Sequence, residues 1–186
     1  MQKQIKELSN ELYQTVLVEN EEKIMITGKS IVINLAPEDM LVNTVNLKYM
    51  KSMLVYSGEC LEGELVLIIK LNEAADIASM FGGNDRVLNE EVKLTEKIIG
   101  FTVLCEENVD VGIHREHDFI ERHTQLIGSG SMCTYESMDS STLQNYVPME
   151  VGYTHDPFIQ KCGDEYPFHT YISNTKVSFL VLKEFQ

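Results

Sequence analysis

The sequence predicts a mainly β protein whose strands form a β-barrel or jelly roll, preceded by one amphipathic helix. Two observations favour this fold class. Short runs rich in β-branched and aromatic residues recur at even spacing, and turn residues such as Gly and Pro separate them, which is typical of sandwiches and barrels. The chain has 186 residues, of which 44% are hydrophobic and 24% are charged. It is therefore long enough for one full-sized globular domain with an added N-terminal part.

Two segments are predicted to be helical. Near the N-terminus, apolar residues recur at spacings of three and four, at Ile5, Leu8, Leu12 and Val16. This periodicity predicts an amphipathic helix that ends at about Val18. A second, short helix is predicted near residues 72–81, because a capping Asn opens the segment and a Gly pair follows it.

The other elements are predicted to be strands. They are residues 23–28, 30–36, 51–58 and 63–71 in the first half, and residues 96–105, 119–128, 131–137, 149–153, 168–173 and 176–185 in the second. We divide the chain at residue 95. Residues 1–95 supply the N-terminal helix and additional strands that pack on the barrel, and residues 96–186 form the barrel itself.

The charge of the chain excludes some partners. Its net charge is −14, and no cluster of Lys or Arg longer than a pair is present. Nucleic acids and anionic membrane surfaces both require concentrated positive charge, so we expect neither as a partner. The longest apolar run, Leu65–Ile69, is far too short to span a membrane. A small molecule is the expected ligand.

The four cysteines and the N-terminus indicate a cytoplasmic protein. The cysteines lie far apart with no CxxC pair, at Cys60, Cys105, Cys133 and Cys162. This spacing favours free, mostly buried thiols in a reducing compartment over a zinc ribbon or disulfides. The first residues also lack the apolar stretch of a secretory signal.

The histidines point to the part of the chain that carries chemistry. All of them follow residue 110, at His114, His117, His123, His155 and His169. His117 precedes Glu121 by four residues, and Gly128 follows Glu121 after six intervening residues. His169 comes two residues after Pro167.

These two patterns resemble the motifs of the cupin superfamily over residues 97 to 185. The resemblance implies a β-barrel that holds a divalent transition metal, such as zinc, iron, manganese or nickel. It places His117, Glu121 and His169 at positions of cupin metal ligands. Arg115 stands where the first motif usually has another His, so His114 or His123 would supply the fourth ligand, and we assign His114. The resemblance also implies that the barrels pair into a homodimer.

The alternation of side chains along a strand allows two orientations of residues 119–128. Glu121, His123 and Gln125 project from one face of a strand. If that face points into a barrel, the polar groups require a metal, a ligand or one another as partners. The opposite face carries Ile120, Thr124 and Leu126. If those residues form the buried side, the polar groups lie in water.

The function predicted from this pattern is that of a metal-dependent isomerase or lyase acting on a small oxygenated metabolite such as a sugar or a hydroxy acid. Glu121 and His123 are the candidate catalytic residues, because a carboxylate and an imidazole beside a metal can transfer a proton. The candidate ligand-binding residues are Arg115, Arg122, Gln125 and Tyr171. Within the cupins, the stretch around Glu121, Arg122 and His123 resembles sugar-anomerase-like proteins and ureidoglycolate lyases.

Two alternatives belong to other functional classes. The same fold can bind a small acid or sugar without catalysis, as a sensor or carrier, with Arg115 or Arg122 pairing the carboxylate of the ligand. The chain can also be a protein-interaction module whose N-terminal helix packs on a partner. His155, just before an Asp–Pro pair, is predicted to lie on the surface, so its replacement by Ala should have almost no effect.

Overall fold

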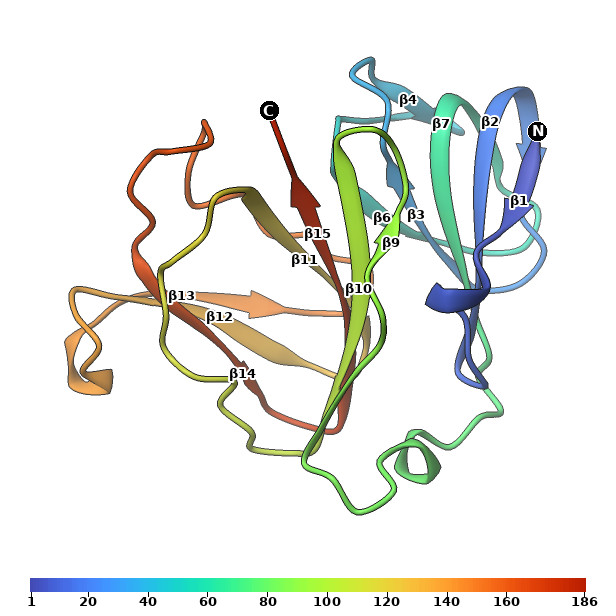
Figure 1. The fold of residues 1–186 in the computed structure, drawn as a ribbon. Helices are drawn as coiled ribbons and strands as arrows, with labels where there is room; N and C mark the ends of the chain where they lie inside the picture. Colours follow the sequence, from blue (N-terminus) through green and yellow to red (C-terminus); the bar gives the residue numbers. More distant parts are fainter. The chain divides into compact units, whose positions relative to one another are not determined.

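The structure is a computed structural model that describes residues 1–186, apart from the side chains of Glu21, Glu22 and Cys60. The regular elements of the described chain are β-strands and a few short 3-10 turns (Figure 1). The chain forms two compact units. Residues 1–76 with residues 152–154 make the first, and residues 77–151 with residues 155–186 make the second. The division predicted from the sequence lies at residue 95.

The first unit is built on one sheet. Its strand order is β1-β2-β7-β3-β6, and β4 joins β7 while β5 joins β4. The bounds are β1 (Gln2–Gln4), β2 (Tyr13–Met25), β3 (Ser30–Asn34), β4 (Met40–Val42), β5 (Val45–Leu47), β6 (Ser52–Val55) and β7 (Cys60–Leu71). The buried core of this sheet is apolar and includes Val18, Val32 and Val66.

The predicted N-terminal helix is wrong. Its residues form the short strand β1, a single 3-10 turn η1 (Lys6–Leu8) and the start of β2. Leu17 and Val18 lie opposite Leu67 and Val66 of β7, and this long-range pairing outweighs a weak local helical periodicity. The hypothesis of an interaction module depended on that helix, so it loses its basis.

The short helix predicted near residues 72–81 is only a 3-10 turn, η2 (Ile77–Met80). Asn72 does not begin a helix. Its side-chain oxygen accepts a hydrogen bond from the N–H of Ala74, and its backbone oxygen accepts one from Ala75. These bonds form a tight turn that competes with a helix start. None of the described helical segments is long and apolar enough to cross a membrane.

The second unit contains two antiparallel sheets. The larger has the order β11-β15-β10-β8, with β9 also paired to β10, and the smaller has the order β13-β12-β14. The bounds are β8 (Arg86–Leu88), β9 (Val92–Lys93), β10 (Ile98–Cys105), β11 (Ile120–Ile127), β12 (Gly130–Tyr135), β13 (Leu143–Met149), β14 (Phe168–Ser173) and β15 (Val177–Glu184), with a 3-10 turn η3 (Ser140–Thr142) before β13. The strand expected over residues 149–153 instead ends at Met149.

Side chains of both sheets meet in one core. Met132 and Tyr171 from the smaller sheet pack with Val103 and Phe179 from the larger one. Two antiparallel sheets joined by a shared core form the jelly-roll arrangement, so the predicted mainly β fold is confirmed. Cys105 and Cys133 are buried and Cys162 is half-buried, all three as free thiols. The prediction for the thiol of Cys60 falls outside the described residues.

Candidate metal centre

The structure decides between the two orientations of β11. Glu121 and His123 are each 6% exposed, and Gln125 is fully buried. These polar groups therefore do not lie in water. Ile120 and Leu126, on the opposite face, are buried as well, so both faces of β11 are covered.

The register of the larger sheet determines which side chains accompany Glu121. Lys183 of β15 lies opposite both Glu121 of β11 and Ile99 of β10. In the same way Val181 lies opposite His123 and Phe101. Directly opposite residues share a face of the sheet. One face therefore changes from polar at β11 to apolar at β10.

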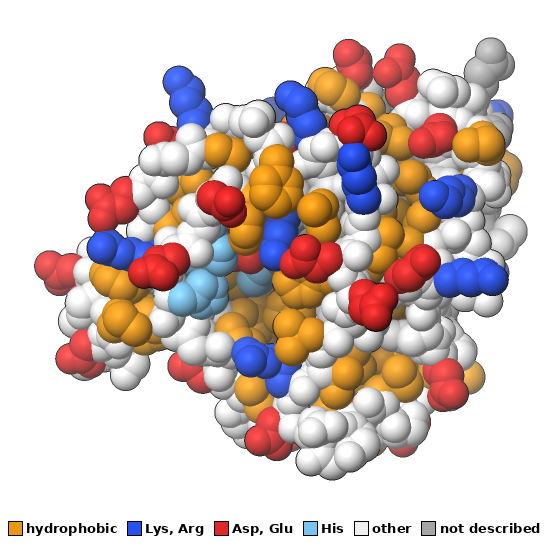
Figure 2. Space-filling model, viewed as in Figure 1, with side chains coloured by type: hydrophobic (Ala, Val, Ile, Leu, Met, Phe, Trp, Pro, Cys, Tyr) orange, Lys and Arg blue, Asp and Glu red, His pale blue; other side chains and the backbone are white. Residues whose placement is uncertain are grey.

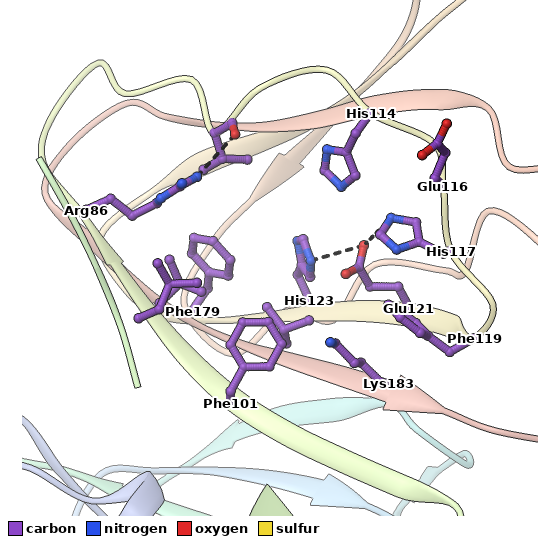
Figure 3. Close-up of a pocket in the computed structure, with 14 residues that line it drawn as sticks. Arg86, Phe101, His114, Glu116, His117, Phe119, Glu121, His123, Phe179 and Lys183 are labelled. Atoms are coloured by element: carbon purple, nitrogen blue, oxygen red, sulfur yellow. Dashed lines mark hydrogen bonds and ion pairs between the residues drawn. The ribbon is translucent and has the colours of Figure 1, made fainter. Parts of the chain in front are cut away.

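The segment before β11 and strand β14 bring three more imidazoles to this face. His114 and His169 exchange two backbone hydrogen bonds, of 3.0 and 2.9 Å, which tie the segment to β14. His117 lies four residues before Glu121, and its Nε2 is 3.2 Å from the Nε2 of His169. Figure 3 shows the imidazoles of His114 and His117 together with the Glu121 carboxylate at one end of a pocket.

The four predicted metal ligands lie together. One ligand atom from each of His114, His117, Glu121 and His169 falls within 4.8 Å of the other three. The Oε2 of Glu121 is 3.4 Å from the Nε2 of His169 and 3.8 Å from that of His117. Ligands of one transition metal each lie about 2.1 Å from it, and therefore about 3 to 4 Å from one another. Small adjustments would let these atoms share one ion.

The outer contacts of two imidazoles orient their rings for such a role. The Nδ1 of His169 is 3.0 Å from the carbonyl oxygen of Pro167, and the Nδ1 of His114 is 2.8 Å from that of Gly112. Because a carbonyl only accepts, Nδ1 is the protonated nitrogen in each ring. The Nε2 lone pair then remains available for a metal.

The charges in the cluster also suit a cation. Burial raises the pKa of the Glu121 carboxyl, but the imidazoles of His123, His169 and His117 outweigh this and hold it well below its ordinary value. Burial lowers the pKa of His117 to about 4, against the opposing charge of Glu121. An ionised carboxylate and a neutral imidazole are the forms that bind metals.

His123 is close to the cluster without belonging to it. Its Nε2 is 3.5 Å from the Oε2 of Glu121, and its Nδ1 is 3.0 Å from the sulfur of Met132. It also lines the pocket beside the cluster. His123 is therefore a neighbour of the cluster that faces the pocket.

The prediction for His155 is wrong, because this side chain is only 1% exposed. Its ring stacks on Phe158 at 5.1 Å and meets the edge of His123 at 5.3 Å. Its backbone N–H donates to the carbonyl oxygen of His123. The Asp–Pro pair is therefore part of a chain segment that folds back onto β11.

The four candidate ligand-binding residues do not line the pocket. Arg115 pairs with Glu165 at 2.7 Å and is 43% exposed. Arg122 pairs with Glu184 at 2.7 Å, and the alternation of β11 puts it on the face opposite Glu121. The hydroxyl of Tyr171 donates to Gln125 at 2.7 Å, and both side chains are fully buried.

The pocket beside the cluster has a volume of about 340 Å³. Its walls include Phe101 and Phe179, and its two cations are Arg86 and Lys183. Figure 2 shows the histidines in a hollow with hydrophobic side chains beside them. None of these four lining residues, the two phenylalanines and the two cations, was among the site residues predicted from the sequence. The alternation of residues 177–183 alone would have put Phe179 and Lys183 on one face.

No protein-family model matches the chain, and no curated protein matches it. Solved structures do. An RmlC-like cupin protein from Desulfovibrio desulfuricans is 17% identical over 61% of this chain and 92% of its own, with a TM-score of 0.41. A cupin 2 conserved barrel protein from Leptotrichia buccalis is 10% identical over 99% and 88%, with a TM-score of 0.42. A salicylate 1,2-dioxygenase from Pseudoaminobacter salicylatoxidans is 5% identical over 93% and 68%, with a TM-score of 0.45.

The first two of these neighbours are described as cupin proteins. They do not establish a subfamily. We base the proposed site on the residues of this chain alone.

Proposed function

We propose that this chain is a metal-dependent cupin-type enzyme, an isomerase or a lyase, that acts on a small oxygenated metabolite. One observation carries the proposal. Three imidazole nitrogens and one carboxylate oxygen lie within 4.8 Å of one another, and three of these four residues sit at the end of a pocket that also contains His123. Burying a carboxylate among imidazoles costs free energy of folding, and coordination of a cation would offset that cost.

His114, His117, Glu121 and His169 would hold the divalent transition metal. When bound, such an ion supplies Lewis acidity toward a carbonyl or hydroxyl oxygen of the substrate. The remaining chemistry belongs to the side chains of this protein. An isomerisation or an elimination of such a substrate requires a proton to be moved, and His123 lines the pocket with its Nε2 facing Glu121. We assign proton transfer to His123.

Glu121 and the pocket walls support that step. The Oε2 of Glu121 lies 3.5 Å from the Nε2 of His123 and orients the imidazole toward the cluster. Phe101, Phe179 and Val181 line the pocket beside His123. Their apolar surfaces exclude water from the reacting atoms and strengthen the electrostatic interactions there.

Elemental analysis of the purified chain tests the metal site. We expect about one transition-metal ion per wild-type chain and a loss of at least tenfold in occupancy for His117→Ala and for His169→Ala, because each removes one ligand. His123→Ala is the matched control, an imidazole beside the cluster that should keep its metal and lose turnover. Circular dichroism should show folded protein in all four samples. Full metal content in His169→Ala would refute the site.

A further inference from the structure

The charge of the pocket differs from the charge of the chain as a whole. The net charge of the chain is −14, yet two cations, Arg86 and Lys183, line a pocket of about 340 Å³. Of the two carboxylates that line it, Glu121 already faces imidazoles and Glu116 is exposed. The two cations and two carboxylates of the lining therefore balance formally. An anion meets less repulsion in this pocket than over a chain of net charge −14.

Lys183 is the cation next to the candidate metal centre. It lies directly opposite Glu121 in the sheet and shares its face. Its ammonium group is 4.7 Å from the ring centre of Phe119 and 5.1 Å from that of Phe101. Figure 3 shows Phe101 on one side of it and Phe119 and Glu121 on the other. Aromatic rings on two sides hold the ammonium group in place and reduce its contact with water.

The present partner of Lys183 can be exchanged. The side chain of Lys183 is 18% exposed, and it pairs at 2.5 Å with Glu91, which is 52% exposed and does not line the pocket. A half-exposed ion pair contributes little free energy. A carboxylate that enters the pocket can therefore replace Glu91, or share the ammonium group with it, at small cost.

The apolar side chains of the pocket determine which kind of ligand fits beyond the carboxylate. Beside Lys183 the sheet presents Phe101, Val181 and then Phe179 and Val103, all of which line the pocket. A sugar would leave many hydroxyl groups against these side chains without hydrogen-bond partners, which is costly. A compact apolar body fits both the surface and the small volume.

We propose that the pocket takes a small carboxylic acid with a compact apolar body, whose carboxylate pairs with Lys183. The inference rests on the proposed function, since it places the oxygen next to the carboxylate at the His/Glu cluster. It narrows the substrate from sugars or acids to apolar hydroxy or keto acids. It also assigns substrate selection to Lys183 in place of Arg115 and Arg122.

Calorimetric titration of the full chain with matched probes tests this selection. The probes are the 2-hydroxy acids mandelate and 2-hydroxy-4-methylpentanoate, the neutral amide of each, and glucose. For wild type we expect each acid to bind roughly ten- to a hundredfold more tightly than its amide, the effect of one charge-assisted hydrogen bond. Lys183→Met, which keeps the apolar stem, should abolish this difference. Lys183→Arg should retain it.

Lys93→Met is the matched control, because Lys93 is a cation in an exposed ion pair with Glu96 and lies outside the pocket lining. It should behave as wild type does. All titrations are repeated after treatment with EDTA, with metal content measured in each sample. The inference is supported if the acids bind more tightly than their amides and Lys183→Met removes that difference, with or without EDTA treatment. Equal binding of acid and amide, no binding of either acid, or tighter binding of glucose would overturn it. Lack of metal in untreated wild type would refute the proposed function separately.

Discussion

Buried polar groups in the two units have different partners. In the first unit Asn34 is fully buried. Its amide donates to the carbonyl oxygens of Glu38 and Leu47 and accepts from the N–H of Ala36, at 2.7 to 3.0 Å. In the second unit the buried carboxylate of Glu121 faces the imidazoles of other side chains. Asn34 therefore hydrogen-bonds to backbone groups, whereas Glu121 contacts the side chains of several histidines.

This difference separates structural polar groups from functional ones. A buried amide that completes backbone hydrogen bonds stabilises one fold. A buried carboxylate among imidazoles costs desolvation free energy that a bound cation would recover. All the histidines belong to the second unit. The residues of the candidate metal centre therefore all belong to the second unit.

Replacing His155 should produce the largest change in stability. This histidine is buried and packs against Phe158, outside the candidate metal cluster. It lies outside the pocket lining, and its Nδ1 is 2.6 Å from the carbonyl oxygen of Asp156. Replacing it by Ala should lower the free energy of unfolding by about 3 kcal/mol, the cost of a cavity beside Phe158. Urea denaturation measures the loss. Metal content should not change. A variant that keeps full stability but loses metal would show that His155 belongs to the metal centre.

The pH dependence of stability supplies a second measure of the same residue. Burial lowers the pKa of His155 to about 3, from an ordinary value of 6.5. Its contribution to stability is therefore complete above about pH 6.5 and decreases as the pH falls toward 3. His155→Phe cannot take up this proton, and its ring can still stack on Phe158. It should flatten the acid side of the stability curve relative to wild type.

Asn34→Ala should have the next largest effect and should act on the first unit alone. The substitution leaves the backbone groups of Ala36, Glu38 and Leu47 without this partner, which should cost about 2 kcal/mol. Urea denaturation measures the cost, and elemental analysis should show unchanged metal content. Loss of metal from this variant would show that the metal centre depends on the first unit.

The sequence predicted the metal cluster because its ligands stand in local motifs. His117 and Glu121 are four residues apart, and only His169 had to be brought in from another strand. The N-terminal helix was wrong for the opposite reason. The spacing of Ile5, Leu8 and Leu12 arises from a turn before a strand, and the pairing of β2 with β7 decides the structure there.

The residues that line the pocket were harder to predict, because their positions depend on cross-strand register. Arg122 was predicted to bind a ligand because its charge can pair a carboxylate. It follows Glu121 directly, however, and adjacent residues of a strand point to opposite faces. Lys183 is far away in the sequence and lies opposite Glu121 in the sheet. A single sequence does not encode that register in any local pattern.

Glu91→Gln should produce the smallest effect, a change in mandelate affinity. This variant tests whether Lys183 binds the carboxylate of the ligand. Glu91 pairs with the ammonium group that the proposed acid would use. Removing its charge should strengthen mandelate binding by about two- to fivefold, because a half-exposed ion pair is worth at most about 1 kcal/mol. Glu96→Gln is the control, since Glu96 pairs with Lys93 and is 92% exposed. If Glu91→Gln weakens mandelate binding instead, Glu91 holds Lys183 in position, and the two carboxylates do not compete for it.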